Sequence, residues 1–306
     1  MSSAGKTYSV PSRDNNINFL RFIAASLVIW FHMASLLAIP EPYIMGQGLG
    51  PIAVNVFFVL SGYLIAKSWT RSSSFGSYLI RRIARIFPGL VVVILLSVFV
   101  MGPIVTSLPL GDYFADAGTW KYLSLIVLAP ISNVLPGVFD ANPLPYAVNG
   151  SLWTLRYEFL AYLLTPLLYA ATKKLCGGRK LVFAVVLAVL VLVHFLSYSG
   201  LYPLPKVLDN LFRLFAYYMA GVAVLELGLD KYCDSQFAVV ALLVIIVFRD
   251  QVGIFSSLIM FVCVCTFTLG FSLTSNPRFA PCFKKNDYSY GIYIYAFPIQ
   301  QCVVWL

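Results

Sequence analysis

The stretch INFLRFIAASLVIWFHMASLLAI, residues 17–39, decides the class of fold. It is long enough to cross the apolar part of a bilayer, which takes about 20 residues of α-helix. This character runs through the chain, because 60% of the 306 residues are hydrophobic and only 11% are charged. Soluble domains carry about 25% charged residues, so lipid is the solvent that fits. We predict an all-α, polytopic transmembrane helix bundle.

Further apolar stretches give the expected number of spans. The strong candidates after the first are 52–69, 87–106, 152–171, 181–199, 211–228, 237–249, 254–273 and 288–306, and a weaker one lies at 121–135. The sequence therefore predicts nine or ten spans. Residues 1–16 are polar and are predicted to form a tail, and residues 17–306 are predicted to form one membrane domain.

Lys and Arg predict the orientation of the bundle. They gather at residues 67–85, 173–180 and 278–285, and short cytoplasmic loops are enriched in both residue types. We therefore expect a cytoplasmic N-terminus, and we attribute the net charge of +9 to these loops rather than to nucleic-acid binding. The charge rule favours nine crossings with 121–135 re-entrant or lying flat. The alternative is ten crossings with one loop that breaks the rule.

Metal chemistry is not expected. The six cysteines are scattered, and the Cys263/Cys265 pair lies in an apolar span with no histidine nearby. That spacing does not resemble a zinc site, so we interpret the cysteines as small core residues.

An ionisable side chain within a membrane span is costly, so it is a candidate functional residue. Arg21 and His32 lie eleven residues apart in the first span. On a helix this is roughly 16 Å along one face. A neutral imidazole is a suitable base near neutral pH. The alternatives are that Arg21 anchors the helix at the interface and that His32 is a packing residue.

Two more charged motifs follow. In RRIARIFPGL (81–90), Arg82 and Arg85 share a helix face. They are either an anchor at the cytoplasmic interface or a clamp for phosphate, which suits the guanidinium fork. In SLWTLRYEFLAYLL (151–164), Glu158 lies within an apolar helix. It either pairs with Arg156 or Arg213, or it is an acid that orients a histidine or a substrate hydroxyl.

Two segments carry polar or small residues at membrane depth. In VNVFFVLSGYLIAKSW (54–69), the pair Ser61 and Gly62 permits close helix packing or shapes a channel beside His32. In DYSYGIYIYAFPIQQ (287–301), the tyrosines, Tyr290 among them, form either an aromatic belt or the wall of a polar cavity.

Together these segments resemble the acyltransferase family 3 of integral membrane acyltransferases. The resemblance covers nearly the whole chain, and the matching motifs occur in the order of the family. They are NFLRFIAASLVIWFHM (18–33), VNVFFVLSGYLI (54–65), RRIARIFP (81–88), SLWTLRYE (151–158) and SYGIYIYAFPIQQ (289–301).

The resemblance implies an O-acyltransferase of the bacterial inner membrane. Such enzymes take an acyl group, usually acetyl, from cytoplasmic acyl-coenzyme A. They pass it to a hydroxyl of a surface polysaccharide, such as O-antigen or exopolysaccharide, or of a lipid-linked precursor. The expected partners are therefore acyl-coenzyme A, a glycan acceptor and membrane lipids, with acetyl-coenzyme A as a substrate and no bound cofactor.

The resemblance also implies roles for individual residues. It makes His32 catalytic, with Glu158 as a second catalytic candidate, and places Arg21, Arg82 and Arg85 around the donor. The remaining motif positions are candidates for substrate binding: Ser61, Gly62, Trp153 and Tyr290. His32 acts either as a general base on the acceptor hydroxyl or as a nucleophile that carries the acyl group.

Two other functions are compatible with parts of the sequence. Broken helices and buried charges also mark transporters of polar solutes, although the sequence contains no inverted repeat. Members of the resembled family usually continue into a further apolar span after the last motif, and this sequence ends at Leu306. A shortened, inactive family member is therefore the third hypothesis.

Overall fold

The computed structural model describes residues 15–129, 133–172, 178–251, 253–274, 283 and 287–306. Most of the predicted N-terminal tail and part of two basic clusters lie outside these ranges. The residues concerned include Lys173, Lys174, Cys176, Arg278, Cys282, Lys284 and Lys285.

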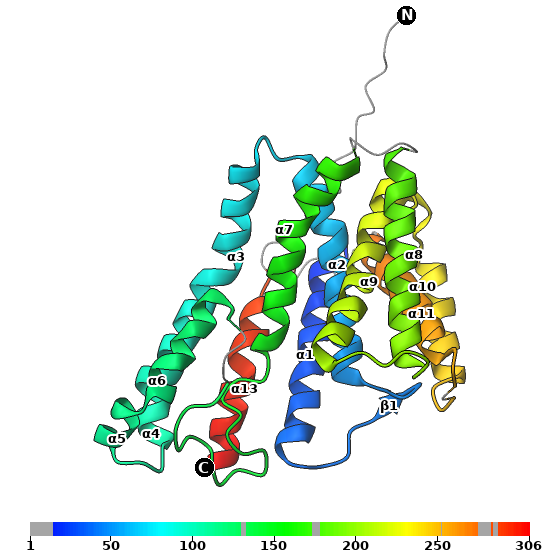
Figure 1. Cartoon of the computed structure of the whole chain (residues 1–306). Helices are drawn as coiled ribbons and strands as arrows, with labels where there is room; N and C mark the ends of the chain where they lie inside the picture. Colours follow the sequence, from blue (N-terminus) through cyan, green and yellow to red (C-terminus); the bar gives the residue numbers. More distant parts are fainter. Residues whose placement is uncertain (1–14, 130–132, 173–177, 252, 275–282, 284–286) are drawn as a thin grey trace, which may run out of the picture.

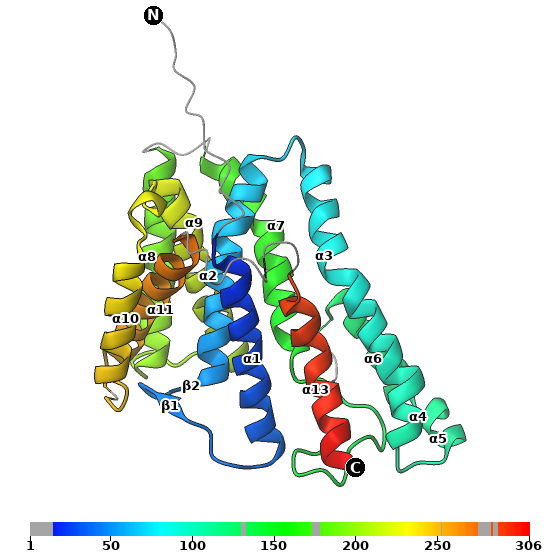
Figure 2. The ribbon, with the colours of Figure 1, turned by 180° about the vertical axis from the view of Figure 1, so that it is seen from behind.

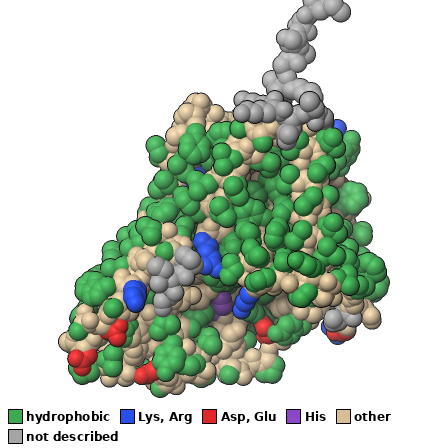
Figure 3. Space-filling view, in the orientation of Figure 1, with side chains coloured by type: hydrophobic (Ala, Val, Ile, Leu, Met, Phe, Trp, Pro, Cys, Tyr) green, Lys and Arg blue, Asp and Glu red, His purple; other side chains and the backbone are tan. Residues whose placement is uncertain are grey.

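Each of the nine strong apolar stretches coincides with a helix in the described part of the chain. These helices are α1 (Ile17–Leu36), α2 (Leu49–Thr70), α3 (Phe75–Leu96), α7 (Leu155–Thr172), α8 (Arg179–Tyr198), α9 (Lys206–Leu227), α10 (Ser235–Val247), α11 (Ser256–Leu273) and α13 (Ser289–Trp305). Six are long and apolar enough to cross a membrane: α1, α2, α8, α9, α11 and α3 with its continuation to Val105. Hydrophobic side chains cover most of the bundle face in Figure 3. The predicted helical membrane bundle is thus confirmed.

Helix α3 begins earlier than the predicted span at 87–106. The Ser74 hydroxyl accepts a hydrogen bond from Ser77 N at 3.2 Å, and the Ser77 hydroxyl accepts one from Ser74 N at 3.3 Å. This reciprocal capping box satisfies donors that a helix start leaves free. The helix continues through η1 (Ser97–Met101) and α4 (Gly102–Val105). The predicted start was wrong because basic residues lowered the hydropathy of the first turns.

The weak segment at 121–135 does not form a crossing helix within the residues that the structure describes. It contains the end of α6 (Ala117–Tyr122) and the 3-10 turn η2 (Leu123–Val127), which follow the short helix α5 (Leu110–Ala115). These turns lie beside the lower part of α3 (Figure 1). The finding agrees with the predicted partial crossing. The other short elements are β1 (Tyr43–Ile44), β2 (Gln47–Gly48), η3 (Leu152–Thr154) and η4 (Asp230–Tyr232).

Helix α2 lies in the middle of the bundle, with α8–α11 on one side and α3, α7 and α13 on the other (Figures 1 and 2). Its contact with α9 depends on two glycines. A Cβ at Gly62 would lie 1.9 Å from Tyr218 O, and a Cβ at Gly221 would lie 2.1 Å from Val59 O. The two backbones therefore approach as closely as small residues allow.

The two ends of the bundle differ. The α2–α3 turn and the adjoining ends of α7 and α8 lie at one end, and the C-terminus lies at the other (Figure 1). Acidic side chains gather toward the C-terminal end in Figure 3. Helices α1 and α13 run side by side and both begin part-way along the bundle, whereas α3 starts near the end that carries the α2–α3 turn (Figure 2). The starts of α1 and α13 therefore lie at depth in the protein.

Candidate active site

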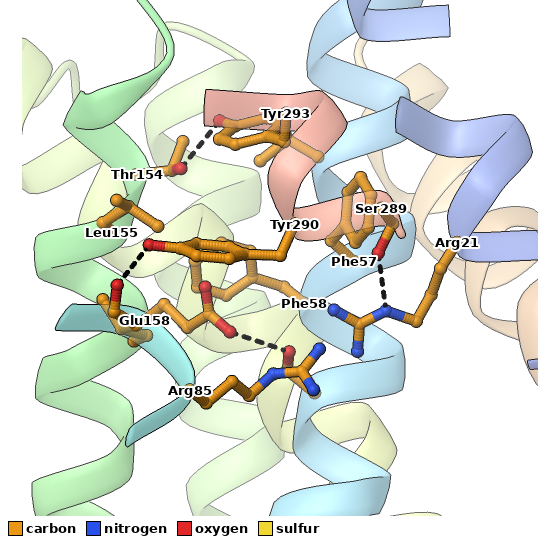
Figure 4. A pocket seen from close by; sticks show the side chains of 13 residues that line it. Arg21, Phe57, Phe58, Arg85, Thr154, Leu155, Glu158, Ser289, Tyr290 and Tyr293 are labelled. Carbon is orange, nitrogen blue, oxygen red and sulfur yellow. Dashed lines mark hydrogen bonds between the residues drawn. The ribbon is translucent and has the colours of Figure 1, made fainter. Parts of the chain in front are cut away.

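A cavity lies where α1, α2, α3, α7 and α13 meet (Figure 4). It contains about 500 Å³ of empty space, including its open side. Aromatic and aliphatic side chains form most of its wall, together with the side chains of two arginines and one glutamate. The lining residues are Arg21, Val54, Phe57, Phe58, Ser61, Arg85, Ile86, Thr154, Leu155, Glu158, Ser289, Tyr290 and Tyr293.

Two arginines of the cavity share one carboxylate. Arg85 Nη2 lies 2.7 Å from Asp287 Oδ2, and Arg21 Nε lies 3.2 Å from the same oxygen. Arg21 Nε also lies 3.2 Å from the Ser289 hydroxyl, to which it donates. Burial raises the pKa of Asp287, but the charges of Arg21 and Arg85 outweigh it and lower this pKa to about 2. Asp287 therefore stays ionised and ties α1 and α3 to the start of α13.

Glu158 lies on the opposite wall of the cavity, on α7. The Ser61 hydroxyl donates to Glu158 Oε1 at 3.4 Å, and the Tyr162 hydroxyl donates to the same oxygen. Neither Arg156 nor Arg213 forms an ion pair with Glu158 in the described part of the chain. The structure therefore contradicts the alternative in which Glu158 pairs with one of these two arginines.

Arg156 and Arg213 instead contact neutral side chains. The Arg156 guanidinium lies 4.9 Å from the centroid of the Tyr157 ring. Arg213 Nη1 donates to Asn55 Oδ1 at 2.8 Å. Glu158 thus faces the cavity with hydroxyl partners, an arrangement that leaves its charge available to polar groups inside.

The Arg82 and Arg85 pair lies on one side of α3, as their spacing predicts. Arg85 lines the cavity. Arg82, one turn nearer the start of α3, lies over the rings of Tyr78 and Tyr162 at 5.9 and 5.8 Å from their centroids. Since Tyr162 also bonds Glu158, the aromatic pair connects Arg82 to the cavity without placing it in the wall.

His32 lies in the same buried stripe of α1 as Arg21, with 8% and 7% of their surfaces exposed. The predicted shared face is therefore confirmed. His32 is not among the lining residues of the cavity. Its ring packs edge-on against Phe297 at 4.9 Å between centroids, and its Nδ1 is buried without a hydrogen-bond partner among the described residues.

The remaining predicted positions separate into two groups. Ser61 and Tyr290 line the cavity, and the Tyr290 hydroxyl donates to Ile86 O at 2.5 Å. Gly62 instead faces α9, and Trp153 packs edge-on against Tyr157 at 5.8 Å without lining the cavity. Gly62 and Trp153 therefore pack against other parts of the protein and do not line the cavity.

Sequence reasoning did not single out Asp287 or Thr154, whereas Tyr293 belongs to the tyrosines for which a cavity wall was one of the two predicted roles. The Thr154 and Tyr293 hydroxyls share a hydrogen bond of 2.8 Å across the cavity wall. Asp287 opens the quoted aromatic motif and is its only acidic residue. A single acidic residue just before a predicted helix was the feature of the sequence that could have marked Asp287 as a site residue.

Comparison with known proteins identifies the family. The model of a family described as an acyltransferase domain matches residues 14–303. The chain belongs to this acyltransferase family. The predicted resemblance is therefore confirmed, and the protein is a membrane-bound acyltransferase of that family.

Several curated acyltransferases are similar to the chain. The O-acetyl transferase of Shigella phage Sf6 is 33% identical over 299 residues, which cover 95% of this chain and 86% of the relative. The peptidoglycan O-acetyltransferase OatA of Listeria monocytogenes is 31% identical over 58% of this chain and 27% of its own. Acyltransferase MdmB of Streptomyces mycarofaciens is 31% identical over 42% of this chain and 30% of its own. No solved structure matches the chain.

Proposed function

We propose that this acyltransferase moves an acetyl group from cytoplasmic acetyl-coenzyme A to a hydroxyl of a cell-surface glycan. The supporting observation is the cavity at membrane depth, which combines two arginines with an aromatic wall in a chain of this family. The similarity to a phage O-acetyl transferase and to a peptidoglycan O-acetyltransferase favours acetyl as the acyl group and a glycan such as O-antigen as the acceptor.

The donor binds from the start of α3. Coenzyme A carries phosphates, and the guanidinium fork of arginine matches phosphate oxygens in charge and geometry. Arg82 lies one turn nearer the start of α3 than Arg85, which lies in the cavity wall. The flexible arm of the donor then extends past Phe57, Phe58 and Tyr290, whose rings offer an apolar surface.

His32 acts as the general base in this proposal. The acceptor oxygen attacks the thioester carbon while the imidazole takes the hydroxyl proton. The carbon–sulfur bond breaks, and the leaving thiolate takes the proton back from the imidazolium. The alternative route, in which His32 first carries the acyl group, differs by an acyl-imidazole intermediate that rapid quenching without acceptor would trap.

The charge distribution supports a cytoplasmic N-terminus. The basic α2–α3 turn and the neighbouring end of α8 lie at one end of the bundle (Figure 1), which the charge rule assigns to the cytoplasm. The bacterial inner membrane is the location that fits this donor. His32 lies eleven residues further along α1 than Arg21, which fits transfer away from the donor side.

Radiolabelled acetyl-coenzyme A tests the proposal. The purified protein in proteoliposomes receives the donor and an O-antigen polysaccharide, and label in the glycan is measured. We expect transfer by the wild type and none by His32→Ala, which should insert normally. Undiminished transfer by His32→Ala would exclude the histidine chemistry. Solute flux without labelled glycan would favour a transporter, and no label from the wild type would favour an inactive family member.

A further inference from the structure

A buried polar contact joins α1 and α13 beside His32. Gln300 Nε2 donates to Ile29 O at 2.9 Å, and Ile29 lies one turn before His32. On α13, Phe297 lies one turn before Gln300 and packs edge-on against the imidazole. Because residues three apart share a helix face, His32 and Gln300 belong to the same contact between these two helices.

Each side chain has one polar atom left over in this contact. His32 Nδ1 and Gln300 Oε1 are both buried and have no hydrogen-bond partner among the described residues. Buried polar atoms are nearly always paired, since an unpaired one costs its desolvation energy. An amide oxygen only accepts, whereas one nitrogen of a neutral imidazole donates. The two unpaired atoms are therefore complementary.

The surroundings contain few competing partners. The imidazole of His32 contacts the rings of Phe31 and Phe297. No carboxylate forms an ion pair with this histidine in the described ranges. The facing turn of α13 carries the neutral side chains of Phe297, Gln300 and Gln301. Of the two glutamines, only Gln300 has an amide oxygen without a partner among the described residues.

We propose that Gln300 is a positioning residue for His32: Oε1 of Gln300 and Nδ1 of His32, both unpaired in the described part of this structure, form a hydrogen bond during the reaction, with Nδ1–H as the donor, which leaves Nε2 as the base. This inference rests on the proposed function, since it assigns the proton-accepting atom in that reaction. When Nε2 takes the acceptor's proton, the bond to Oε1 holds the imidazolium in place until the thiolate recovers that proton.

Gln301 provides a matched control on the same helix. Its Nε2 donates to Leu144 O at 3.0 Å and to Ala147 O at 2.8 Å, and its Oε1 accepts from Asn142 Nδ2 at 2.6 Å. Its amide is therefore fully used in holding the preceding loop. Substitution of Gln301 tests for general damage to α13 without removing the atom assigned to His32.

¹⁵N NMR of the protein in lipid bilayers tests the inference directly, because it shows which imidazole nitrogen carries the proton. The chain has two histidines, so His194→Gln leaves His32 as the single ¹⁵N-labelled imidazole. We expect Nδ1–H in this background and with Gln301→Leu, and a gain of Nε2–H with Gln300→Leu. An unchanged tautomer in Gln300→Leu, or an equal change in Gln301→Leu, would overturn the assignment. This result does not depend on acyl transfer, so it is separable from failure of the proposed function.

Kinetics supply the second readout. Gln300→Leu should lower kcat by about 100-fold, the scale of general-base catalysis, and leave KM for the donor unchanged. Gln300→Glu should keep the hydrogen bond and raise the basicity of His32, so the rising limb of the pH–rate profile moves up by about one pH unit. A uniform loss at every pH, without movement of that limb, would mean a purely structural role.

Discussion

Arg85, which lines the cavity, and Asp287, which is 202 residues away in the sequence, meet at 2.7 Å. Arg21 shares the same carboxylate oxygen. The side chains of Arg21, Asp287 and Arg85 are 8%, 19% and 31% exposed, so this charge cluster is partly removed from water. It joins the first, third and last of the described long helices at one point.

Replacement of Asp287 by alanine should destabilise the protein by about 3 kcal/mol, because it leaves two guanidinium groups partly buried without their carboxylate. Thermal unfolding in detergent measures the loss. Coenzyme A should recover more thermal stability in this variant than in the wild type, because its phosphates replace the missing charge. Equal stabilisation of both proteins by coenzyme A would contradict this explanation.

Arg85 and Arg82 should differ in their effect on donor binding. Arg85→Ala removes a charge from the cavity wall, and a charge-assisted hydrogen bond contributes about 1.5–3 kcal/mol, so KM for the donor should rise by roughly 10- to 150-fold. Arg82→Ala should have a smaller effect, because that guanidinium lies over Tyr78 and Tyr162. Steady-state kinetics compares the two, and the reverse ranking would count against the proposed donor path.

Gly62→Ala should weaken the contact between α2 and α9. The added Cβ would lie 1.9 Å from Tyr218 O, and backbone cannot give way as a flexible side chain does, so we expect a loss of about 1–3 kcal/mol. Gly76→Ala is the control, since its nearest neighbour is the Ser74 hydroxyl at 4.0 Å. Thermal unfolding should show lower stability for the first variant only.

Gly150→Ala should impair the chemical step while donor binding is retained. Its Cβ would lie 2.6 Å from the Phe297 ring, which itself packs against His32. Displacement of that ring moves the imidazole, so kcat should fall while KM for acetyl-coenzyme A stays near the wild-type value. Gly111→Ala, which meets no atom within 4 Å, serves as the control. A changed KM with unchanged kcat would place Gly150 at the donor instead.

Sequence alone was sufficient for the helices and for the shared face of Arg21 and His32, because both follow from local periodicity and hydropathy. It was insufficient for Asp287, whose partners lie on helices far away in the chain. The early start of α3 depends on Ser74 and Ser77, whose capping bonds are weak signals beside a basic run. Gly62 was recognised as a small residue, but only the structure shows that Tyr218 is the residue it approaches.

The position of α13 as the last of the described helices has a consequence for biosynthesis. Three residues of the cavity wall, Ser289, Tyr290 and Tyr293, come from α13, which is translated after all the other described helices. During synthesis the first eight long helices are therefore complete before the cavity has all of its wall. A ribosome stalled before α13 would leave an inserted protein whose arginines lack Asp287 and whose cavity lacks a wall, so incomplete chains should not consume acyl donor.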